Sequence, residues 1–389
     1  MKILILTFYY PPDLCAGSFR AGQLVSALNK ATDKDIFIEV ISTIPNRYNA
    51  YKPENIVDQD NGNIKIHRLE LPNHKSGMKD QAIAFLHYAK GVFKITRHKK
   101  YDLIFATSSR LMTAALGATL SKKNKTRLYL DIRDIFTDTI ADVVQQKLLI
   151  RTLMPILKFL ERWTYSAADE INLVSQGFIK DVSNISPKSS ITTFTHGIDK
   201  EFLNYDFSRK SVRKKMLITY AGNFGESQGL HYIIPFAASA IKDFAEIKLI
   251  GDGGKKTELI SAIKNHQVDN VEICDPVNRD SLLIEYSNTD ILFLCLNDKA
   301  AFLKVLPSKL FEYAATGKPI LAGVSGYAAK FINENIVGCE VFPPGDSNKM
   351  IEKLDLLIKG PKSYNREAFK CKFSRENIML KYAKKIIEN

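Results

Sequence analysis

Short, continuous apolar runs, each followed by a loop and then by a helical pattern, recur in both halves of this chain. In the first half, the run Lys2–Thr7 precedes a loop and a helical pattern that ends near Asn29. In the second half, Met216–Ala221 precedes the glycine-bearing loop Gly222–Gly229 and the helical pattern Leu230–Ala240. Central parallel strands are buried on both faces and therefore apolar throughout, so this alternation predicts an α/β fold. Ligands of such folds bind where the strands end in loops.

The length of the chain indicates two domains. A chain of 389 residues is too long for one ordinary hydrophobic core. We expect a first domain at residues 1–200, a second at 201–370, and a terminal amphipathic helix within 371–389. The hydrophobic content of 45% and the charged content of 25% are those of a globular protein, which excludes a disordered chain.

The cysteines and the apolar runs predict a cytoplasmic location. The five cysteines are odd in number, widely scattered and without metal-type spacing, as expected for thiols in a reducing compartment. Residues 1–10 resemble a first strand and lack the longer apolar region and cleavage site of a signal peptide. No apolar run approaches the ~20 residues that a membrane-spanning helix needs.

The net charge of +13 is concentrated in one stretch of the first half. Residues 90–127 hold ten basic side chains and one acidic side chain, Asp102. The basic residues are Lys90, Lys94, Arg97, Lys99, Lys100, Arg110, Lys122, Lys123, Lys125 and Arg127. Such a cluster indicates an anionic partner, which could be nucleic acid, an anionic membrane leaflet or a phosphorylated substrate. The alternative is a solvated basic surface without a partner.

The segment Lys147–Trp163 is strongly apolar with evenly spaced cations. Its pattern fits a core helix kinked by Pro155, and it equally fits a helix that lies on anionic lipid. Taken with the basic cluster, the second interpretation predicts that the first domain binds a membrane surface.

The segment Leu306–Leu321 carries the chemistry that is easiest to interpret. Ser308 is a predicted N-cap of a short helix, Gly317 is its predicted C-terminal stop, and a strand follows. Lys309 and Glu312 lie in the first turns of this helix. A lysine near a helix N-terminus suits a phosphate group, and a carboxylate suits the two hydroxyls of a ribose. The alternative is a surface helix with a solvated lysine and glutamate.

The sequence Pro-Ser-Lys-Leu-Phe-Glu-Tyr-Ala-Ala-Thr-Gly-Lys-Pro-Ile in this segment resembles the donor-binding segment of glycosyltransferase family 4. These are retaining nucleotide-sugar transferases of the GT-B fold, with two Rossmann-like domains facing a central cleft. The closest branch in appearance builds bacterial O-antigens and capsules and includes the N-acetyl-L-fucosamine transferases. The resemblance implies that Glu312 holds the ribose, that Lys309 meets the diphosphate, and that the terminal helix crosses back to the first domain. Ser308 belongs to the same donor-binding segment.

Two departures from the family pattern concern the donor site. The family often carries two glutamates eight residues apart, and here Lys304 stands where the first would be. We therefore place Lys304 in the cleft without assigning it a sugar. In the glycine-bearing loop the family often has a basic residue, and here Gln228 takes that place. Gly222, Asn223 and Gly225 of this loop are expected to bring backbone N–H groups close to a phosphate.

The first half supplies further candidates at the predicted ends of its strands. The resemblance implies that Gly17 lies near the donor diphosphate, while Arg20 behind it could equally be structural. Ser108 follows the predicted strand 102–107 and is expected to face the cleft. His196 is a candidate hydrogen-bonding group in a turn, where a histidine is more often structural.

The charged sequence Asp131-Ile-Arg-Asp134 ends another predicted strand. Carboxylates within the end of a sheet are costly unless they are paired or used. A structural interpretation has Asp131 as a cap and Arg133 paired with Asp134. A functional interpretation has Asp134 accept the proton of an acceptor hydroxyl, with Arg133 in the cleft.

These observations predict a retaining glycosyltransferase that moves a sugar from a UDP-sugar to a lipid-linked saccharide in O-antigen or capsule synthesis. The resemblance makes an N-acetylated deoxyhexosamine a candidate sugar. No metal or other cofactor is expected, since no Asp-x-Asp stands at a suitable strand end and Lys309 would stabilise the leaving diphosphate. The partners are then the nucleotide sugar, a polyprenyl-diphosphate-linked acceptor and the anionic inner face of the plasma membrane, without nucleic acid. The alternatives are a UDP-sugar 2-epimerase of the same fold and a non-enzymatic nucleic-acid-binding protein.

Overall fold

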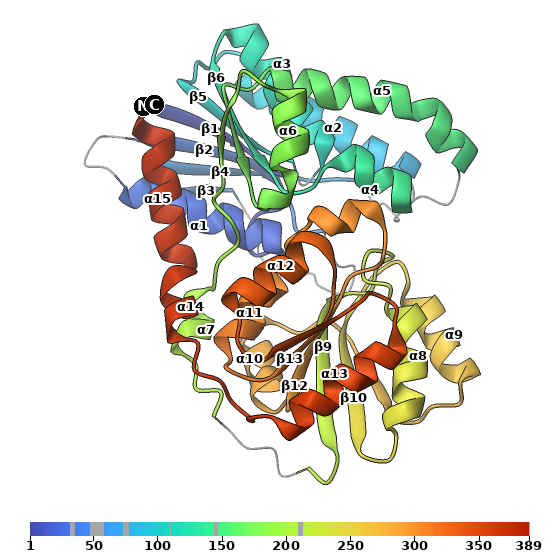
Figure 1. Cartoon of the computed structure of the whole chain (residues 1–389). Coiled ribbons are helices and arrows are strands. Elements are labelled where there is room, and N and C mark those ends of the chain that lie inside the picture. Colours follow the sequence, from blue (N-terminus) through green and yellow to red (C-terminus); the bar gives the residue numbers. More distant parts are fainter. Residues whose placement is uncertain are drawn as a thin grey trace. The chain divides into compact units, whose positions relative to one another are not determined.

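The computed structural model describes residues 1–31, 36–46, 58–72, 78–108, 110–143, 147–208 and 213–388. The chain forms two compact units (Figure 1). Unit 1 comprises Met1–His196 and Glu376–Asn389, and unit 2 comprises Gly197–Arg375. Each unit has its own sheet and its own hydrophobic core.

The sheet of unit 1 has eight strands in the order β3-β4-β2-β1-β5-β6-β7-β8. All neighbouring pairs are parallel except β3 and β4, which are antiparallel. Because β2 and β5 flank β1, the loop after β1 lies where the strand order reverses, which is where open α/β sheets bind ligands. The strands are β1 (Lys2–Leu6), β2 (Phe37–Thr43), β3 (Gln59–Asp60), β4 (Ile64–Leu69), β5 (Leu103–Thr107), β6 (Arg127–Ile132), β7 (Glu170–Leu173) and β8 (Ser190–Thr192).

Helices cover the sheet of unit 1 on both faces (Figure 1). Side chains of α1 and α15 share one hydrophobic core with residues of β1, β2, β5 and β6. Helix α3 packs against β5 and β6, and α2 packs against β2. The helices of this unit are α1 (Ala16–Lys30), α2 (Met78–Thr96), α3 (Leu111–Asn124), α4 (Phe136–Val143), α5 (Lys147–Ser166), the 3-10 helix η1 (Gln176–Phe178), α6 (Ile179–Ile185) and α15 (Arg375–Glu388).

The terminal helix α15 therefore belongs to unit 1, although unit 2 lies between it and the rest of unit 1 in the sequence. Its apolar stripe, Met379, Tyr382, Ala383 and Ile386, is buried in the core of unit 1. These positions follow the spacing of one helix face, so the amphipathic pattern of the segment is explained by this packing.

The sheet of unit 2 has six parallel strands in the order β11-β10-β9-β12-β13-β14. The strand order reverses at β9, which lies between β10 and β12, so the loops after β9 and β12 flank the switch point. The strands are β9 (Met216–Asn223), β10 (Ala245–Asp252), β11 (Val271–Cys274), β12 (Ile291–Cys295), β13 (Ile320–Gly323) and β14 (Cys339–Phe342).

Helices α8, α9 and α13 share the main hydrophobic core of unit 2 with its sheet. On α10 and α11, Tyr286 and Tyr313 pack edge to face with a centroid distance of 5.3 Å. The helices of this unit are α7 (Lys200–Asn204), α8 (Leu230–Ile241), α9 (Lys256–Asn265), α10 (Arg279–Ser287), the 3-10 helix η2 (Ala300–Lys304), α11 (Lys309–Ala315), α12 (Gly326–Asn335), α13 (Ser347–Lys359) and α14 (Glu367–Lys372). Within the described part of the chain, no helix is both long enough and apolar enough to cross a bilayer.

Candidate active site

The glycine-bearing loop follows β9 at the switch point of unit 2. Gly222 has a φ of +149° and Gly229 a φ of +60°, so the backbone leaves the ordinary strand and helix conformations at both ends. The side chain of Gln228 closes the loop, because its Oε1 accepts hydrogen bonds from Asn223 Nδ2 (3.0 Å) and from Gly225 N (3.3 Å). Gln228 therefore shapes the loop where the family pattern has a cation.

Lys309 lies directly against this loop. A Cβ added at Gly222 would overlap the Cε and Nζ atoms of Lys309, so the ammonium lies directly against the backbone of this glycine. The φ of +149° is what favours glycine at this position. The ammonium lies 5.5 Å from the centroid of the Tyr220 ring, within the range of a cation–π contact. The structure thus brings together the lysine and the glycine loop, which are 87 positions apart (309 − 222) in the sequence.

Helix α11, which carries Lys309, is fixed by its apolar face. Leu310, Phe311 and Ala314 are fully buried. Gly317 has a φ of +73° directly after the helix, as predicted for its stop. The predicted N-cap is wrong: Ser308 has helical dihedral angles and its side chain makes no capping hydrogen bond.

Glu312 lies one turn further along α11 and is held by Arg279, which is not among the site residues predicted from the sequence. Arg279 Nη1 donates to Glu312 Oε1 at 2.7 Å, and the Glu312 side chain is 13% exposed. Arg279 also forms an ion pair with Asp199. A cation at the start of α10 is unfavourable with respect to the helix dipole. This position was the one signal in the sequence that Arg279 pairs with acidic residues outside its own helix.

The segment after β12 is attached to the same glycine loop. Asn297 N donates to Ser227 O (2.8 Å), and Lys299 Nζ pairs with Glu226 at 3.0 Å. Lys304 ends η2 in this segment and is half-buried. Residues 297–304 and the glycine loop therefore form one surface at the carboxyl ends of β9 and β12.

In unit 1, Gly17 and Arg133 lie against each other. The guanidinium of Arg133 approaches Gly17 so closely that a Cβ at this position would overlap it. Ser108 Oγ accepts from the backbone N–H of Arg133 at 3.0 Å, which joins a third candidate to the pair. The Nε atom of Arg133 is buried without a hydrogen-bond partner among the described residues. The pair thus presents a cation beside the start of α1, an arrangement that suits an anion.

Asp134 and His196 are the remaining candidates of unit 1. Asp134 is exposed two residues beyond β6, and His196 is buried at the end of unit 1. Protein atoms around Asp134 displace part of its solvent and raise the pKa of its carboxyl group, and the charge of Arg133 opposes the rise. Because the side chain is exposed, we expect water to weaken this shift. None of the described ion pairs joins Asp134 to Arg133, so the structural interpretation is left with only the longer-range attraction between their charges.

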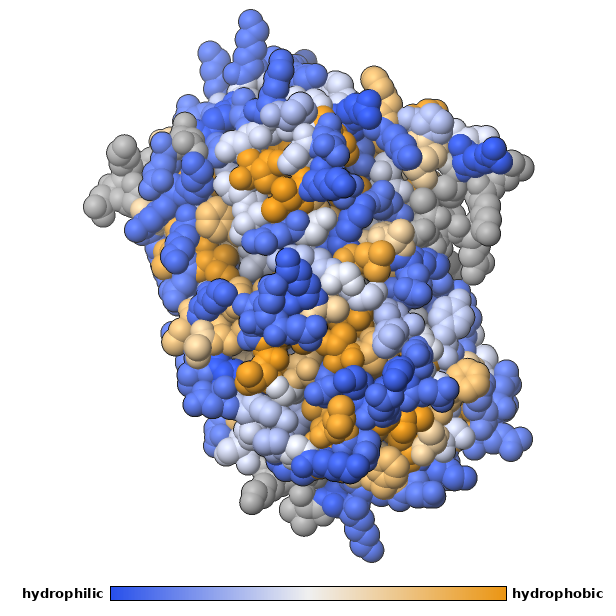
Figure 2. Space-filling model, viewed as in Figure 1, coloured by the Kyte–Doolittle hydropathy of each residue, from blue (hydrophilic) through white to orange (hydrophobic). Residues whose placement is uncertain are grey.

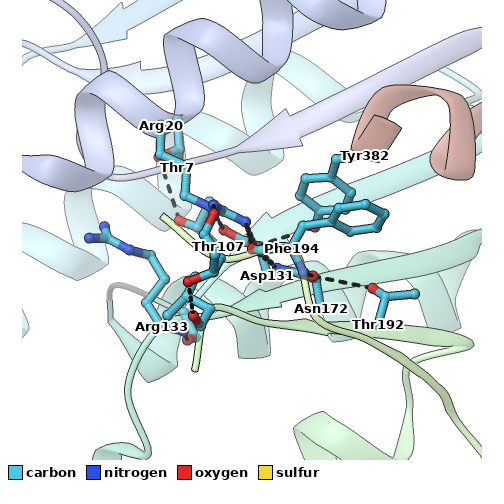
Figure 3. A network of polar contacts seen from close by, with 12 residues as sticks. Thr7, Arg20, Thr107, Asp131, Arg133, Asn172, Thr192, Phe194 and Tyr382 are labelled. Atoms are coloured by element: carbon cyan, nitrogen blue, oxygen red, sulfur yellow. Dashed lines mark hydrogen bonds and ion pairs between the residues drawn. The ribbon is translucent and has the colours of Figure 1, made fainter. Parts of the chain in front are cut away.

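Asp131 is a structural residue, although its contacts are those of an ion pair and not those of the cap that one of the two interpretations assigned to it. It forms a two-pronged ion pair with Arg20, with Nε to Oδ2 and Nη2 to Oδ1 both at 2.9 Å (Figure 3). Asn172 and Tyr382 also donate to Oδ1, at 2.8 Å and 3.2 Å. Figure 3 shows that Arg133 points away from this network.

The charges of this network are stabilised in the folded unit. Burial alone would raise the pKa of Asp131, but Arg20 and the donated hydrogen bonds lower it overall. Burial would lower the pKa of Arg20, and Asp131 raises it overall. The two shifts agree, so Arg20 and Asp131 form a charged pair that connects α1, β6, β7 and α15.

Across the described residues, no group of three or more histidine, cysteine, aspartate and glutamate side chains is arranged to hold a metal ion.

Comparison with protein families identifies the unit that carries Lys309 and Glu312. Residues 202–369 match the model of glycosyl transferases group 1. This segment is therefore similar to group 1 glycosyltransferase domains, and the chain is a glycosyltransferase. The match includes Gly222, Gly225 and Lys304 of the candidate site. Gly17, Ser108, Arg133 and Asp134 lie outside it.

Similar proteins extend over the whole glycosyltransferase chain. WcaI of Escherichia coli (strain K12), named for glycosyl transfer in colanic acid biosynthesis, is 23% identical over 384 residues, which are 92% of this chain and 91% of WcaI. The crystal structure of Anabaena Alr3699/HepE in complex with UDP has a TM-score of 0.68 at 14% identity and covers 100% of both chains. The apo lipopolysaccharide outer core galactosyltransferase WaaB has a TM-score of 0.64 at 11% identity, over 100% of this chain and 99% of WaaB. The fold is therefore GT-B, with two Rossmann-like units.

Proposed function

We propose that this glycosyltransferase is a retaining enzyme that transfers a sugar from a UDP-sugar to a lipid-linked saccharide in bacterial O-antigen or capsule synthesis. The observation that carries the proposal is the position of the Lys309 ammonium over Gly222, with Glu312 on the same short helix. A cation over a glycine loop suits a diphosphate, and a carboxylate one turn away suits the hydroxyls of a ribose.

The proposed reaction exchanges one bond at the anomeric carbon of the sugar. The bond from this carbon to the β-phosphate oxygen breaks, and the bond to the acceptor oxygen forms on the same face. The nucleoside diphosphate leaves with the bonding electron pair, and Lys309 would stabilise its growing negative charge. Asp134 would take the proton of the acceptor hydroxyl. We propose that no metal ion takes part and that the Arg133–Gly17 pair meets a phosphate group of a substrate.

The identity of the donor and acceptor rests on the similar proteins. UDP is favoured because the structure of Alr3699/HepE was solved with UDP and, in another crystal, with UDP-glucose. The names of WcaI and WaaB place these relatives in colanic acid and lipopolysaccharide synthesis. The resemblance to N-acetyl-L-fucosamine transferases makes an N-acetylated deoxyhexosamine the first sugar to try on a polyprenyl-diphosphate-linked acceptor.

The test is incubation of the enzyme with a panel of UDP-sugars, with and without a polyprenyl-diphosphate-linked saccharide and with and without EDTA. Transfer that needs the acceptor and survives EDTA supports the proposal. Conversion of the UDP-sugar to another UDP-sugar without an acceptor would show a 2-epimerase instead. Binding to DNA or RNA that weakens steeply with salt, without any response to UDP-sugars, would show a nucleic-acid-binding protein.

We further propose that unit 1 binds the anionic surface of the membrane on its cytoplasmic side. Helix α5 runs through Pro155 and exposes Ile156 (63%) and Phe159 (71%), which supports the interpretation of this stretch as a helix that lies on lipid. The ammonium of Lys122 on α3 makes a cation–π contact with the ring of Trp163, at 4.7 Å from the ring centroid. Figure 2 shows one face of the molecule, on which hydrophobic residues reach the surface among hydrophilic ones.

The basic cluster of residues 90–127 contributes to this surface in part. Seven of its ten cations are exposed, and the other three are half-buried. Of these three, Lys99 pairs with Glu39, Arg110 donates to Tyr9, and Arg127 donates to the carbonyl of residue 386. Each cation near an anionic surface contributes about 1 kcal/mol to binding, so the exposed cations of this cluster favour attachment to an anionic surface.

Replacing Ile156 and Phe159 together by glutamate should weaken binding to vesicles that contain phosphatidylglycerol by at least about tenfold, because apolar burial is lost and two negative charges are added. Vesicle co-sedimentation measures this effect. The matched control is Leu356→Glu, which changes an exposed leucine of unit 2 (49% exposed) and should leave binding unchanged. Equal binding by the double variant and the wild type would contradict the membrane proposal.

A further inference from the structure

We propose that Arg279 is a positioning residue for Glu312, and that it fixes the carboxylate for the ribose by connecting it to Asp199. This inference rests on the proposed function, because it takes a nucleoside diphosphate as the ligand of unit 2. All residues involved belong to unit 2.

The guanidinium of Arg279 is held from three sides. One nitrogen donates to Glu312 Oε1, and another is paired with a carboxylate oxygen of Asp199. The ring of Phe202 lies under the guanidinium, with 4.7 Å from its centroid to Cζ. Because a guanidinium is planar with donors in a fixed fork, these contacts determine its orientation and thus the direction of the Glu312 carboxylate.

Asp199 is itself held in place by burial and by a second ion pair. It is 4% exposed and forms a second ion pair, with Arg375 Nε at 2.8 Å from its Oδ1. Arg375 is itself bound to the backbone, since its Nη2 donates to Gly197 O at 2.8 Å. The backbone N–H of Arg375 also donates a hydrogen bond to the carbonyl oxygen of Ile198 at 2.9 Å. The contacts therefore run from Glu312 to two backbone segments at the ends of unit 2.

Glu312 retains capacity for a ligand in this arrangement. A carboxylate offers two oxygens with about four acceptor positions. Arg279 donates to Oε1, which leaves acceptor positions for the two vicinal hydroxyls of a ribose. Arg279 also restricts the rotation of the carboxylate, so the ligand does not have to order it. Such preorganisation strengthens binding without a direct contact between Arg279 and the ligand.

The experiment compares UDP with its 2′,3′-dideoxy analogue, because only UDP offers both ribose hydroxyls to Glu312. Isothermal titration calorimetry of the full chain gives the affinity for each compound. In the wild type we expect UDP to bind at least about tenfold more tightly, as for hydrogen bonds to a charged group. Arg279→Ala should remove most of this preference and leave the affinity for the dideoxy analogue nearly unchanged. In the Glu312→Ala background, Arg279→Ala should cause no further loss.

Two further variants make the result decisive. Arg279→Lys keeps the positive charge but lacks the planar fork that reaches two carboxylates, so it should retain only part of the preference for UDP. This variant provides the test if Arg279→Ala does not fold. Arg213→Ala is the matched control, because Arg213 pairs with Glu246 at 3.5 Å elsewhere in unit 2 and should leave the preference intact.

The outcomes separate this inference from the proposed function. If the wild type prefers UDP and the variants of Arg279 keep the full preference, the inference about Arg279 is wrong and the proposed function still stands. A wild type that binds neither compound would overturn the proposed function and this inference with it. Loss of affinity for both compounds to the same extent in Arg279→Lys would show a merely structural residue and also overturn it.

Discussion

Lys309→Met lowers kcat for sugar transfer by about 100-fold to about 1,000-fold, which is the typical effect of removing one group that stabilises charge in a transition state. The ammonium lies over Gly222, where the diphosphate is proposed to leave, so its loss affects the leaving group more than the binding of the sugar. Methionine keeps most of the volume of the side chain. The measurement is the initial rate of UDP release with donor and acceptor at saturation.

Glu312→Ala should instead act on binding. Loss of hydrogen bonds from the ribose to a charged carboxylate costs about 1.5–3 kcal/mol, which corresponds to about tenfold to about 100-fold in KM for the donor. The control for both variants is Lys349→Met, which changes a lysine on α13 whose side chain is 52% exposed and should leave both constants unchanged. Normal turnover by both Lys309→Met and Glu312→Ala would refute the donor-site assignment.

Arg20→Ala has the largest expected effect on stability. It leaves the buried carboxylate of Asp131 without its ionic partner, and breaking a buried pair from one side costs about 3–5 kcal/mol. The side chains of Arg20 and Asp131 are only 3% and 2% exposed, so water cannot replace the lost contacts. Trp163 is the single tryptophan and lies in unit 1, so its fluorescence during urea unfolding reports on this unit.

The double variant Arg20→Ala with Asp131→Ala provides the control, because it removes the unpaired charge. It should recover part of the stability that Arg20→Ala loses. If Arg20→Ala and the wild type unfold at the same urea concentration, then Asp131 is not a charged residue of the folded unit.

The pH dependence follows from the same pair. The pKa of Asp131 is lower in the folded unit than in the unfolded chain, so the pair stabilises unit 1 above the unfolded pKa, near about 4. This contribution is lost as the pH falls through the folded pKa. The difference in unfolding free energy between the wild type and Asp131→Asn should therefore shrink as the pH is lowered from about 6 to about 3.

The GT-B fold could be predicted because its central strands are apolar without interruption. Lys2–Leu6 and Ile291–Cys295 are buried over nearly their full length, and such runs leave few alternatives to a parallel sheet. The strand Cys339–Phe342 was not predicted, because it lies at an edge of the sheet, is mostly half-buried and contains a charged residue. Its assignment depends on pairing with β13, which is a tertiary contact.

The candidate site could be predicted where the signal was local. Lys309, Glu312 and the stop at Gly317 lie within nine residues of one another, and helix spacing relates them. The partners of charged residues could not be predicted in this way. Arg20 is 111 positions from Asp131, and Arg279 is 80 positions from Asp199, so only the fold brings them together. For the same reason, the sequence alone could not distinguish the buried Asp131 from the exposed Asp134 three residues later.

The most direct test of the central claim is the melting temperature of the full chain with UDP, GDP and ADP at equal concentrations. A ligand that binds only the folded state raises this temperature, because at 100 times its Kd it adds about 2.7 kcal/mol to the free energy of unfolding. For the wild type we expect the largest rise with UDP, and for Glu312→Ala we expect a smaller rise with UDP. If none of the three nucleotides raises the melting temperature, unit 2 holds no nucleoside diphosphate and the proposed donor site is contradicted.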